Sequence, residues 1–312
     1  MNESTKRLAL AISSYEDVCT GYKNSSHPCH KIVNWQTSQW SPKVTDVTGS
    51  AMHRPEAWTG DLERAPIIFL ASNPSFGLKE NFPNWGDKWQ DKDIADFGAD
   101  RFDVEKHKTF GATDGPIFKY ADRVLEVDGK MSRRVSHWQW VRRFASLVLN
   151  KPLDETSAIS DYVMTEMVHC KSFNEIGVPQ ALRHCTDKWL GKILEISPAK
   201  LIFIAGVKPA RNFVDIYSDF VPDSWGSWTN PKGKAGKGEW PKSNSDLEER
   251  IKTGQWTLDI QKRNSFEMEL AGVKRTIVFL ARKGGASPNA PWINRDLVHE
   301  DLLSYWRSKM AP

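Results

Sequence analysis

The chain has 312 residues, of which 39% are hydrophobic and 26% are charged, so it can form a sizeable core and is not disordered throughout. No apolar run is long enough to span a bilayer, and the charged N-terminus is typical of an amphipathic helix rather than of a signal peptide, which predicts a cytoplasmic protein. The net charge of +4 and the pI near 8.7 permit nucleic-acid binding without demanding it.

The predicted elements begin with a helix over residues 6–20, and the polar, turn-rich stretch after it contains Cys29. The first convincing strand is PIIFLA, residues 66–71, which leads into Asn73-Pro74-Ser75. Proline ends hydrogen-bond ladders, and asparagine competes with regular backbone structure. The strand therefore ends there, either as an ordinary exit into a loop or as the floor of an active site.

Residues 77–115 form a long irregular segment rich in Asn, Asp, Gly, Trp and Phe. Loops of that length inside a compact domain are usually functional or partly folded insertions. Two helices are predicted next. One covers residues 115–127, with Pro116 near its first turn, and the other covers residues 136–150, where aromatic and apolar residues recur at helical spacing.

The second half of the chain alternates between strands and helices. The predicted strands are ISDYVMTEMVHCKS, which ends near Thr165–Cys170, AKLIFIAG (199–206) and KRTIVFLA (274–281). The predicted helices cover residues 179–197, 207–217 and 294–310, and residues 222–246 form a loop rich in Gly, Lys and Trp. The alternation predicts a three-layer α/β/α sandwich around a mostly parallel four-stranded sheet. We expect one domain over residues 1–312, with insertions at about 77–115 and 222–265, and strand-end loops that meet at one edge.

Four segments, taken in order, are similar to the uracil-DNA glycosylase superfamily. FLASNPSFGL resembles the strand-end motif G-I-N-P-G-L of its mismatch-specific branch, and GPIFKYADRVL resembles the G-x-P-F-x-G-x-A-G-x-L-L segment of its iron–sulfur branch. The run from YVMTEMVHCKS to KLIFIAG resembles that branch's T-N-V-V-K-C-R-P…C-x-x-x-L…P-K-x-I-x-x-L-G run, and VFLARKGGASP stands where the superfamily carries His-Pro-Ser. The resemblance covers about half of the chain. It implies a uracil-DNA glycosylase-like fold and a monofunctional DNA glycosylase, which is an N-glycosyl hydrolase.

The chain has four cysteines, Cys19, Cys29, Cys170 and Cys185. Disulfides are rare in the cytosol, and counting alone favours four unrelated buried thiols. The resemblance implies a [4Fe–4S] cluster instead, because the iron–sulfur branch uses two N-terminal cysteines, one after the second strand and one on the following helix. Four thiolates also suit zinc, which is the alternative cofactor. The cluster would be structural and would tie the N-terminal segment to the second strand.

Base excision requires a nucleotide outside the stack, stabilisation of the charge that develops on the departing base, and a water held against C1′ of the sugar. The resemblance assigns the water to Asn73, whose side-chain oxygen can accept a hydrogen bond while Pro74 rigidifies the loop. An ordinary turn asparagine is the alternative. The superfamily's histidine is missing. Arg282 and Lys283 stand near its position, where a cation could neutralise the base or hold a phosphate.

The base itself is expected to meet Phe118, which by resemblance stacks on it, with Phe76 as a competitor and Ser72 in the same pocket. A core phenylalanine is the alternative role of Phe118. Glu166 aligns with the superfamily's asparagine that reads uracil. A carboxylate only accepts hydrogen bonds and suits the exocyclic amino group of cytosine, so we infer a cytosine-type base. A salt bridge at the strand end is the alternative role of Glu166.

The remaining expectations concern DNA and the two insertions. Residues expected to contact DNA are Lys208 and Arg211 after the third strand and Asn289 and Trp292 in the last loop. The chain has 14 Trp, and aromatic rings suit both bases and sugars. The insertions contribute several of them and could admit a bulky substituent, or they could be plain surface loops.

Together these features predict a glycosylase for hypermodified cytosine, such as glucosylated hydroxymethylcytosine in phage DNA, acting in antiviral defence. The alternatives are a repair glycosylase for uracil or another deaminated base, and a DNA-binding member of the superfamily without catalysis. DNA is the expected partner, with no membrane and no obligate protein partner. The sequence lacks the glycine-rich phosphate loops that a nucleotide-handling enzyme would carry.

Overall fold

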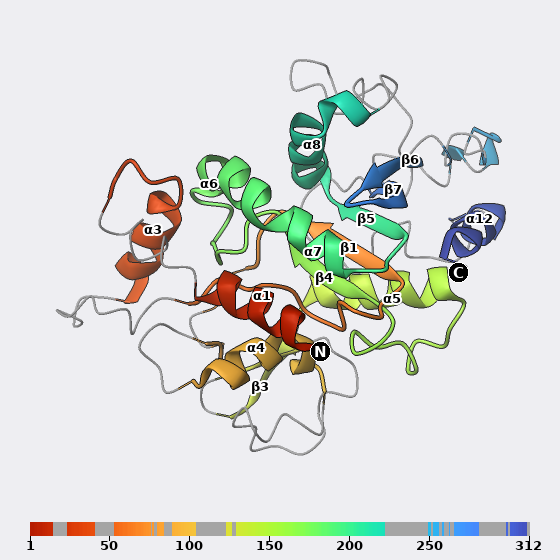
Figure 1. The fold of residues 1–312 in the computed structure, drawn as a ribbon. Helices are drawn as coiled ribbons and strands as arrows, with labels where there is room; N and C mark the ends of the chain where they lie inside the picture. The colour runs from red at the N-terminus through yellow and green to blue at the C-terminus, as the bar shows by residue number, and fades with distance from the viewer. Residues whose placement is uncertain are drawn as a thin grey trace.

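The structure is a computed structural model of the 312-residue chain (Figure 1). It describes residues 1–14, 24–40, 53–75, 77, 80–83, 89–103, 123–126, 129–221, 249–250, 252–255, 258, 262, 265–280, 298 and 300–310.

A five-stranded sheet with the order β4-β1-β5-β7-β6 forms the centre of the described chain. Its strands are β1 (Ile67–Ala71), β4 (Val163–Glu166), β5 (Leu201–Ala205), β6 (Ser265–Leu270) and β7 (Val273–Leu280). The pairs β1–β4, β1–β5 and β5–β7 are parallel, and β6 pairs antiparallel with β7. The prediction of a mostly parallel sheet in an α/β protein is confirmed, but the sheet has five strands rather than four.

The fifth strand, β6, is joined to β7 by a tight hairpin. Ala271 and Gly272 connect the two strands with φ angles of +53° and +71°, which is the left-handed backbone that a two-residue hairpin turn requires. Leu270 pairs with Val273 directly across this turn. The run KRTIVFLA predicts the final strand from Lys274 onward, but β6 before it was not predicted, because Ala-Gly is not among the strong two-residue hairpin signals.

Helices cover both faces of the sheet (Figure 1). The described helices are α1 (Glu3–Ser13), α3 (His30–Trp40), α4 (Asp91–Asp100), α5 (Ser136–Leu149), α6 (Val178–Cys185), the π-helical turn η2 (Thr186–Leu190), α7 (Gly191–Ile196), α8 (Val207–Ile216), the 3₁₀ turn η3 (Ser218–Phe220) and α12 (Glu300–Met310). One core joins the sheet to α1, α6, α7 and α8, and the other joins it to α5 and α12. Alternate residues of β1 serve the two cores, since Ile68 and Leu70 face one and Ile67 and Phe69 face the other.

Three expectations about local structure need correction. Helix α3 occupies part of the stretch predicted to be turn-rich, and it buries Ile32 and Val33 despite its polar composition. The helix predicted over residues 115–127 is contradicted at its end, where β2 (Arg123–Leu125) pairs antiparallel with β3 (Met131–Arg134). The segment predicted to be irregular over residues 77–115 contains α4, which packs against α1. None of the helices in the described part of the chain is long and apolar enough to cross a bilayer.

Candidate functional site at the carboxyl edge of the sheet

The order of the parallel strands defines where a ligand is expected. Strand β1 lies between β4 and β5 in the sheet. The chain passes from β1 to β4 on one side of it and then crosses to β5 on the other side. In open α/β sheets, ligands bind outside the carboxyl ends of the strands where the connections change direction. That point lies between β1 and β5, so the loop after Ala71 enters the expected binding edge directly.

Asn73 is fixed in this loop by both hydrogens of its side-chain amide. Nδ2 donates to the carbonyl oxygen of Pro74 at 2.9 Å and to that of Ser172 at 3.2 Å. The backbone N–H of Ser172 donates to the Pro74 carbonyl at 3.0 Å, so the loops after β1 and β4 are joined side by side. Within the described residues, no hydrogen bond occupies the amide oxygen Oδ1 of Asn73. The amide is therefore oriented by its nitrogen, which leaves its oxygen as an acceptor.

Glu166 is the last residue of β4 and lies opposite Ala71 of β1 in the register. Its Oε2 atom is buried and has no hydrogen-bond partner in the described part of the chain, and the same holds for Oγ of Ser72. Burial, followed by the nearby carboxylate of Glu56, raises the pKa of Glu166 well above its ordinary value, against the opposing effect of Lys171. The environment of Glu166 therefore favours its protonated form more than water does. When protonated, a glutamic acid donates as well as accepts a hydrogen bond, so the base that Glu166 favours depends on its protonation state.

A buried ion network lies behind this edge, formed by Glu56, Glu80, Arg101 and Lys171. Lys171 Nζ lies 3.0 Å from a carboxylate oxygen of each glutamate. Arg101 Nη1 lies 2.7 Å from Glu56, and its Nη2 also pairs with Glu80. Burial alone would raise the pKa of Glu56, but Arg101 and Lys171 lower it to about 2. Two cations thus balance two carboxylates in a site where an unpaired charge would be very costly.

The ion network reaches the Asn73 loop through Lys171. Its ammonium group donates to the backbone oxygen of Ser75 at 3.3 Å and lies 4.1 Å from the centre of the Phe82 ring. The backbone oxygen of Lys171 accepts a hydrogen bond from the side-chain amide of Gln36 on α3 at 2.5 Å. One buried lysine therefore connects the loop after β1, the loop after β4 and the N-terminal helix α3.

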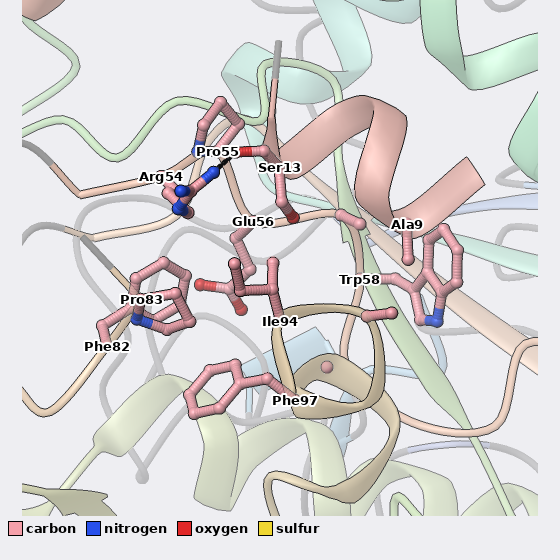
Figure 2. Close-up of a pocket in the computed structure, with 13 residues that line it drawn as sticks. Ala9, Ser13, Arg54, Pro55, Glu56, Trp58, Phe82, Pro83, Ile94 and Phe97 are labelled. Carbon is pink, nitrogen blue, oxygen red and sulfur yellow. Dashed lines mark hydrogen bonds between the residues drawn. The ribbon is translucent and has the colours of Figure 1, made fainter. Parts of the chain in front are cut away.

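A small cavity lies beside Glu56, between α1 and α4 (Figure 2). Its volume is about 20 Å³, which is room for about one water molecule. In Figure 2 the Glu56 carboxylate points toward the wall that Phe82, Pro83 and Phe97 form. This cavity is too small for a nucleobase, and it belongs to the ion network rather than to the binding edge.

Three of the four cysteines converge in the core on the α6 side of the sheet. Cys29, Cys170 and Cys185 are buried thiols. A hydrogen bond with Cys29, followed by burial, raises the pKa of Cys170. Burial raises the pKa of Cys185 to about 12, and the Cys185 sulfur accepts a hydrogen bond from the backbone N–H of His169 at 3.4 Å. No three His, Cys, Asp or Glu side chains in the described ranges are already arranged around a single metal ion.

The three cysteines come from separate elements, so a metal cofactor bound by their thiolates would have to connect those elements. Cys29 directly precedes α3, Cys170 follows β4, and Cys185 ends α6. A multi-iron cluster takes each cysteine at a different iron atom, so its ligands need not surround one point as zinc ligands must. The three described thiols can therefore contribute to the predicted cluster without surrounding a single point. Cys19, the fourth predicted ligand, lies outside the described residues.

A stacked aromatic pair with one exposed member lies at the same edge and was not predicted from the sequence. The rings of Trp35 on α3 and Phe173 stack with centroids 5.6 Å apart and planes 9° from parallel. Phe173 directly follows Ser172, whose carbonyl holds Asn73, and it is 49% exposed. Flat, exposed rings suit stacking on a base. The signal in the sequence was an aromatic residue directly after the predicted strand-end loop.

The structure therefore brings together only part of the predicted site. The carboxyl edge of the sheet holds Asn73, Ser72 and Glu166. A second group, in which the side chains interact with one another, consists of Cys29, Cys170 and Cys185. Lys208 and Arg211 belong to α8, which begins where β5 ends, but their side chains are not among the described ones. The predicted residues outside the described part of the chain are Cys19, Phe76, Phe118, Arg282, Lys283, Asn289 and Trp292.

Comparison of the sequence with protein-family models and with curated proteins finds no match. The functional argument therefore rests on the geometry of the site and on the motifs of the sequence.

Proposed function

We propose that this protein is a monofunctional DNA glycosylase with a uracil-DNA glycosylase-like three-layer architecture, which excises a hypermodified cytosine such as glucosylated hydroxymethylcytosine from phage DNA. The observation that carries the proposal is the Asn73 amide. Its nitrogen is anchored on two carbonyl groups, and its oxygen is left as an acceptor at the switch point of the sheet. Holding a water against C1′ of a flipped nucleotide requires such an arrangement.

The reaction is hydrolysis of the bond between the base and C1′ of the sugar. Asn73 Oδ1 accepts a hydrogen bond from the attacking water and fixes the direction of its approach, while the hydrogen bonds to Pro74 and Ser172 prevent the amide from rotating. As the bond breaks, negative charge develops on the base. We assign its stabilisation to Arg282 and Lys283 and the stacking on the base to Phe118 or Phe76.

Specificity for a large cytosine derivative is assigned to Glu166 and to the two insertions. Glu166 ends β4 next to the Asn73 strand, where it can meet the amino-group edge of a base. The insertions at 77–115 and 222–265 are rich in Trp and Lys, and aromatic rings suit the sugar that glucosylation adds. Selectivity for a bulky modification would spare the host's ordinary cytosine, as antiviral defence requires.

The cofactor of this proposal is a [4Fe–4S] cluster held by Cys29, Cys170 and Cys185 together with Cys19. When bound, it would supply a structural cross-link and no step of hydrolysis. His169 and Lys171 flank Cys170, and the backbone N–H of His169 already reaches the Cys185 sulfur. Iron and sulfide analysis of anaerobically purified protein tests the cluster. Iron and sulfide at four of each per chain would support it, and zinc alone or neither would remove it.

One observation favours a second candidate, excision of uracil or another deaminated base. A protonated carboxylic acid both donates and accepts a hydrogen bond, and burial and Glu56 favour the protonated form of Glu166 by raising its pKa. It can therefore pair with O4 and N3–H of uracil much as an amide does. The glycosylase function is common to both candidates, and only the released base separates them.

Mass spectrometry of released bases tests the proposal. The DNAs are unmodified, uracil-containing, hydroxymethylated at cytosine, and glucosylated at hydroxymethylcytosine. The proposal predicts release of the glucosylated base and retention of ordinary cytosine. Release of uracil instead would favour the repair glycosylase. Tight binding of all four DNAs with no release from any would favour a non-catalytic DNA-binding protein.

A further inference from the structure

Two buried polar atoms at the candidate site lack the hydrogen bonds that burial normally requires. They are Oε2 of Glu166 and Oγ of Ser72, neither of which has a partner in the described residues. Both side chains stand where β1 and β4 end side by side, and Ser72 directly precedes Asn73. Native proteins leave few buried polar atoms unsatisfied, and those few call for an explanation. A ligand at the binding edge would supply the missing partners.

Burial has the largest effect on the pKa of Glu166, and the charged groups that face it modify that pKa further. Glu56 lies before β1, while Lys171 and Glu175 lie in the loop after β4. The two glutamates oppose ionisation of Glu166, and Lys171 favours it. The positive charge of Lys171 is balanced by its ion pairs with Glu56 and Glu80 at 3.0 Å. Burial disfavours the charged form of an acid and is the dominant cause of the raised pKa of Glu166.

On the basis of the glycosylase function proposed above, we propose that Glu166 is the general acid of the reaction. It donates its proton to ring nitrogen N3 of a cytosine-type base while its other carboxyl oxygen accepts a hydrogen bond from the N4 amino group. Glu166 would then be a catalytic residue, and not solely a reader of the base.

The proposed step balances without any further reactant. The bond between N1 and C1′ breaks, and its electron pair stays with the base. The proton from Glu166 arrives at N3, so the base leaves as a neutral N3–H tautomer instead of an anion. Water adds to C1′ and releases one proton to solvent. The Glu166 carboxylate takes up one proton from solvent before the next turnover.

This role distinguishes cytosine from uracil by chemistry as well as by hydrogen bonding. N3 of cytosine has a lone pair that can take a proton, whereas N3 of uracil already carries one. A glutamic acid whose pKa is raised by an apolar environment is a known kind of general acid. It would also lessen the need for the superfamily's histidine, which this sequence does not carry.

The test compares single-turnover rates of base release by the wild type and by Glu166→Gln on DNA that contains glucosylated hydroxymethylcytosine. Glutamine keeps a donor and an acceptor at the same place but cannot give up a proton. We expect DNA binding within about threefold of wild type and a rate lower by on the order of 10²–10⁴-fold. The wild-type rate should fall as pH rises through the raised pKa of Glu166, and the residual Glu166→Gln rate should lack that limb.

Glu175→Gln is the matched control, because it makes the same substitution in the neighbouring loop. Removing this like charge should move the falling limb of the wild-type profile to lower pH and leave the plateau rate unchanged. The infrared spectrum adds a readout that does not depend on catalysis. The wild type should show a protonated carboxyl band at neutral pH that is absent from Glu166→Gln.

The outcomes separate this proposal from the function on which it rests. Wild-type release of the base with an unchanged Glu166→Gln rate would overturn the general acid and leave the glycosylase intact. Wild-type release that fails only in Glu166→Gln, with binding kept and the infrared band lost, would support both. No release by the wild type from any DNA would overturn both, whatever the infrared band shows.

Discussion

At the scale of single residues, the two ends of the Asn73 amide have different tasks. The nitrogen joins the loop after β1 to the loop after β4 through Pro74 and Ser172. The oxygen is the end assigned to the water. Pro74 contributes a fixed backbone angle and its own carbonyl acceptor. Substitutions at Asn73 can therefore separate structural support from chemistry.

Asn73→Ala removes both ends and should abolish base excision while DNA affinity stays within a few-fold of wild type. Asn73→Asp keeps an oxygen for water but places a carboxylate against two carbonyl oxygens, so we expect a loss of about 1–3 kcal/mol in stability. Urea unfolding and base-release assays on the two variants check this. Full excision by Asn73→Ala would remove this residue from the mechanism.

Glu166 makes the stability of the protein depend on pH in a defined direction. Its folded-state pKa is raised, so between the ordinary pKa and the raised one the unfolded chain has lost a proton that the folded chain retains. Stability therefore falls as pH rises across that window. Glu166→Gln removes this penalty, and its melting temperature should exceed that of wild type by more at pH 8 than at pH 5. A difference that does not change with pH would show that Glu166 is not held neutral.

At the scale of elements, the buried ion network holds together segments that are distant in the sequence. Glu56 precedes β1, Glu80 follows it, Arg101 follows α4, and Lys171 follows β4. The exposed fractions of Glu80 and Lys171 are only 6% and 1%. Water cannot reach charges that are so deeply buried. Removing one of the four side chains should therefore destabilise the fold strongly, because it leaves a buried charge uncompensated. The network contacts the Asn73 loop through the hydrogen bond from Lys171 to the backbone oxygen of Ser75.

Lys171→Met should cost about 3–5 kcal/mol of stability, because it leaves two buried carboxylates with Arg101 as the single remaining cation of the network. The double variant Lys171→Met/Glu80→Gln should recover part of that loss, since it removes one of the stranded charges. Lys151→Met is the matched control, because Lys151 pairs with Asp161 at 2.9 Å with a third of its side chain exposed. Its cost should be about 0–1 kcal/mol in the same urea titration. Equal losses at the two lysines would contradict the network.

The elements that the sequence predicted well are those with a strong local pattern. Strands β1 and β5 are continuous apolar runs, and α5 repeats its apolar residues at helical spacing, so all three were predicted close to their observed positions. Strand β4, by contrast, has only four residues and ends in Thr165 and Glu166, so it is much shorter than the strand predicted there. Helix α3 was missed because polar residues outnumber the apolar ones that it buries. The pairing of Lys171 with Glu80 could not be predicted, because it joins residues 91 positions apart. Only the folded sheet brings them together.

The candidate site shows the same division. Asn73 was predicted from a strand that ends in Asn-Pro, which is a local signal. The protonation state of Glu166 was not, because it depends on burial and on Glu56 and Glu175, which are brought to it by the fold. The convergence of Cys29, Cys170 and Cys185 was expected only through the resemblance, since their spacing alone fits unrelated thiols equally well.

At the scale of the whole molecule, one edge of the sheet gathers residues to which the proposed function assigns a role. The anchored Asn73 amide, the buried carboxyl group of Glu166 and the stacked pair Trp35–Phe173 come from widely separated parts of the chain. The cysteines lie behind the same loops, where a cluster would hold α3 and its aromatic residue against the loop after β4. The binding surface and its structural support are thus continuous.

Phe173→Ala should weaken DNA binding, because an aromatic ring that stacks on a base contributes about 1–3 kcal/mol. That range corresponds to a loss of affinity of roughly 5- to 100-fold. Phe220→Ala serves as the control, since Phe220 is 65% exposed and lies in η3, beyond the end of α8 away from the binding edge. Fluorescence anisotropy with labelled DNA measures both. Equal affinities of the two variants would show that the Trp35–Phe173 pair does not contact DNA.

The most direct test of the central claim is hydrolysis of glucosylated hydroxymethylcytosine DNA in ¹⁸O-labelled water, followed by mass spectrometry of the base and of the DNA. If Asn73 holds the attacking water, the wild type should release the free modified base and leave an abasic site that carries ¹⁸O. Asn73→Ala should bind the same DNA and yield neither product. Release by Asn73→Ala at the wild-type rate, or no release from this DNA by the wild type, would contradict the account.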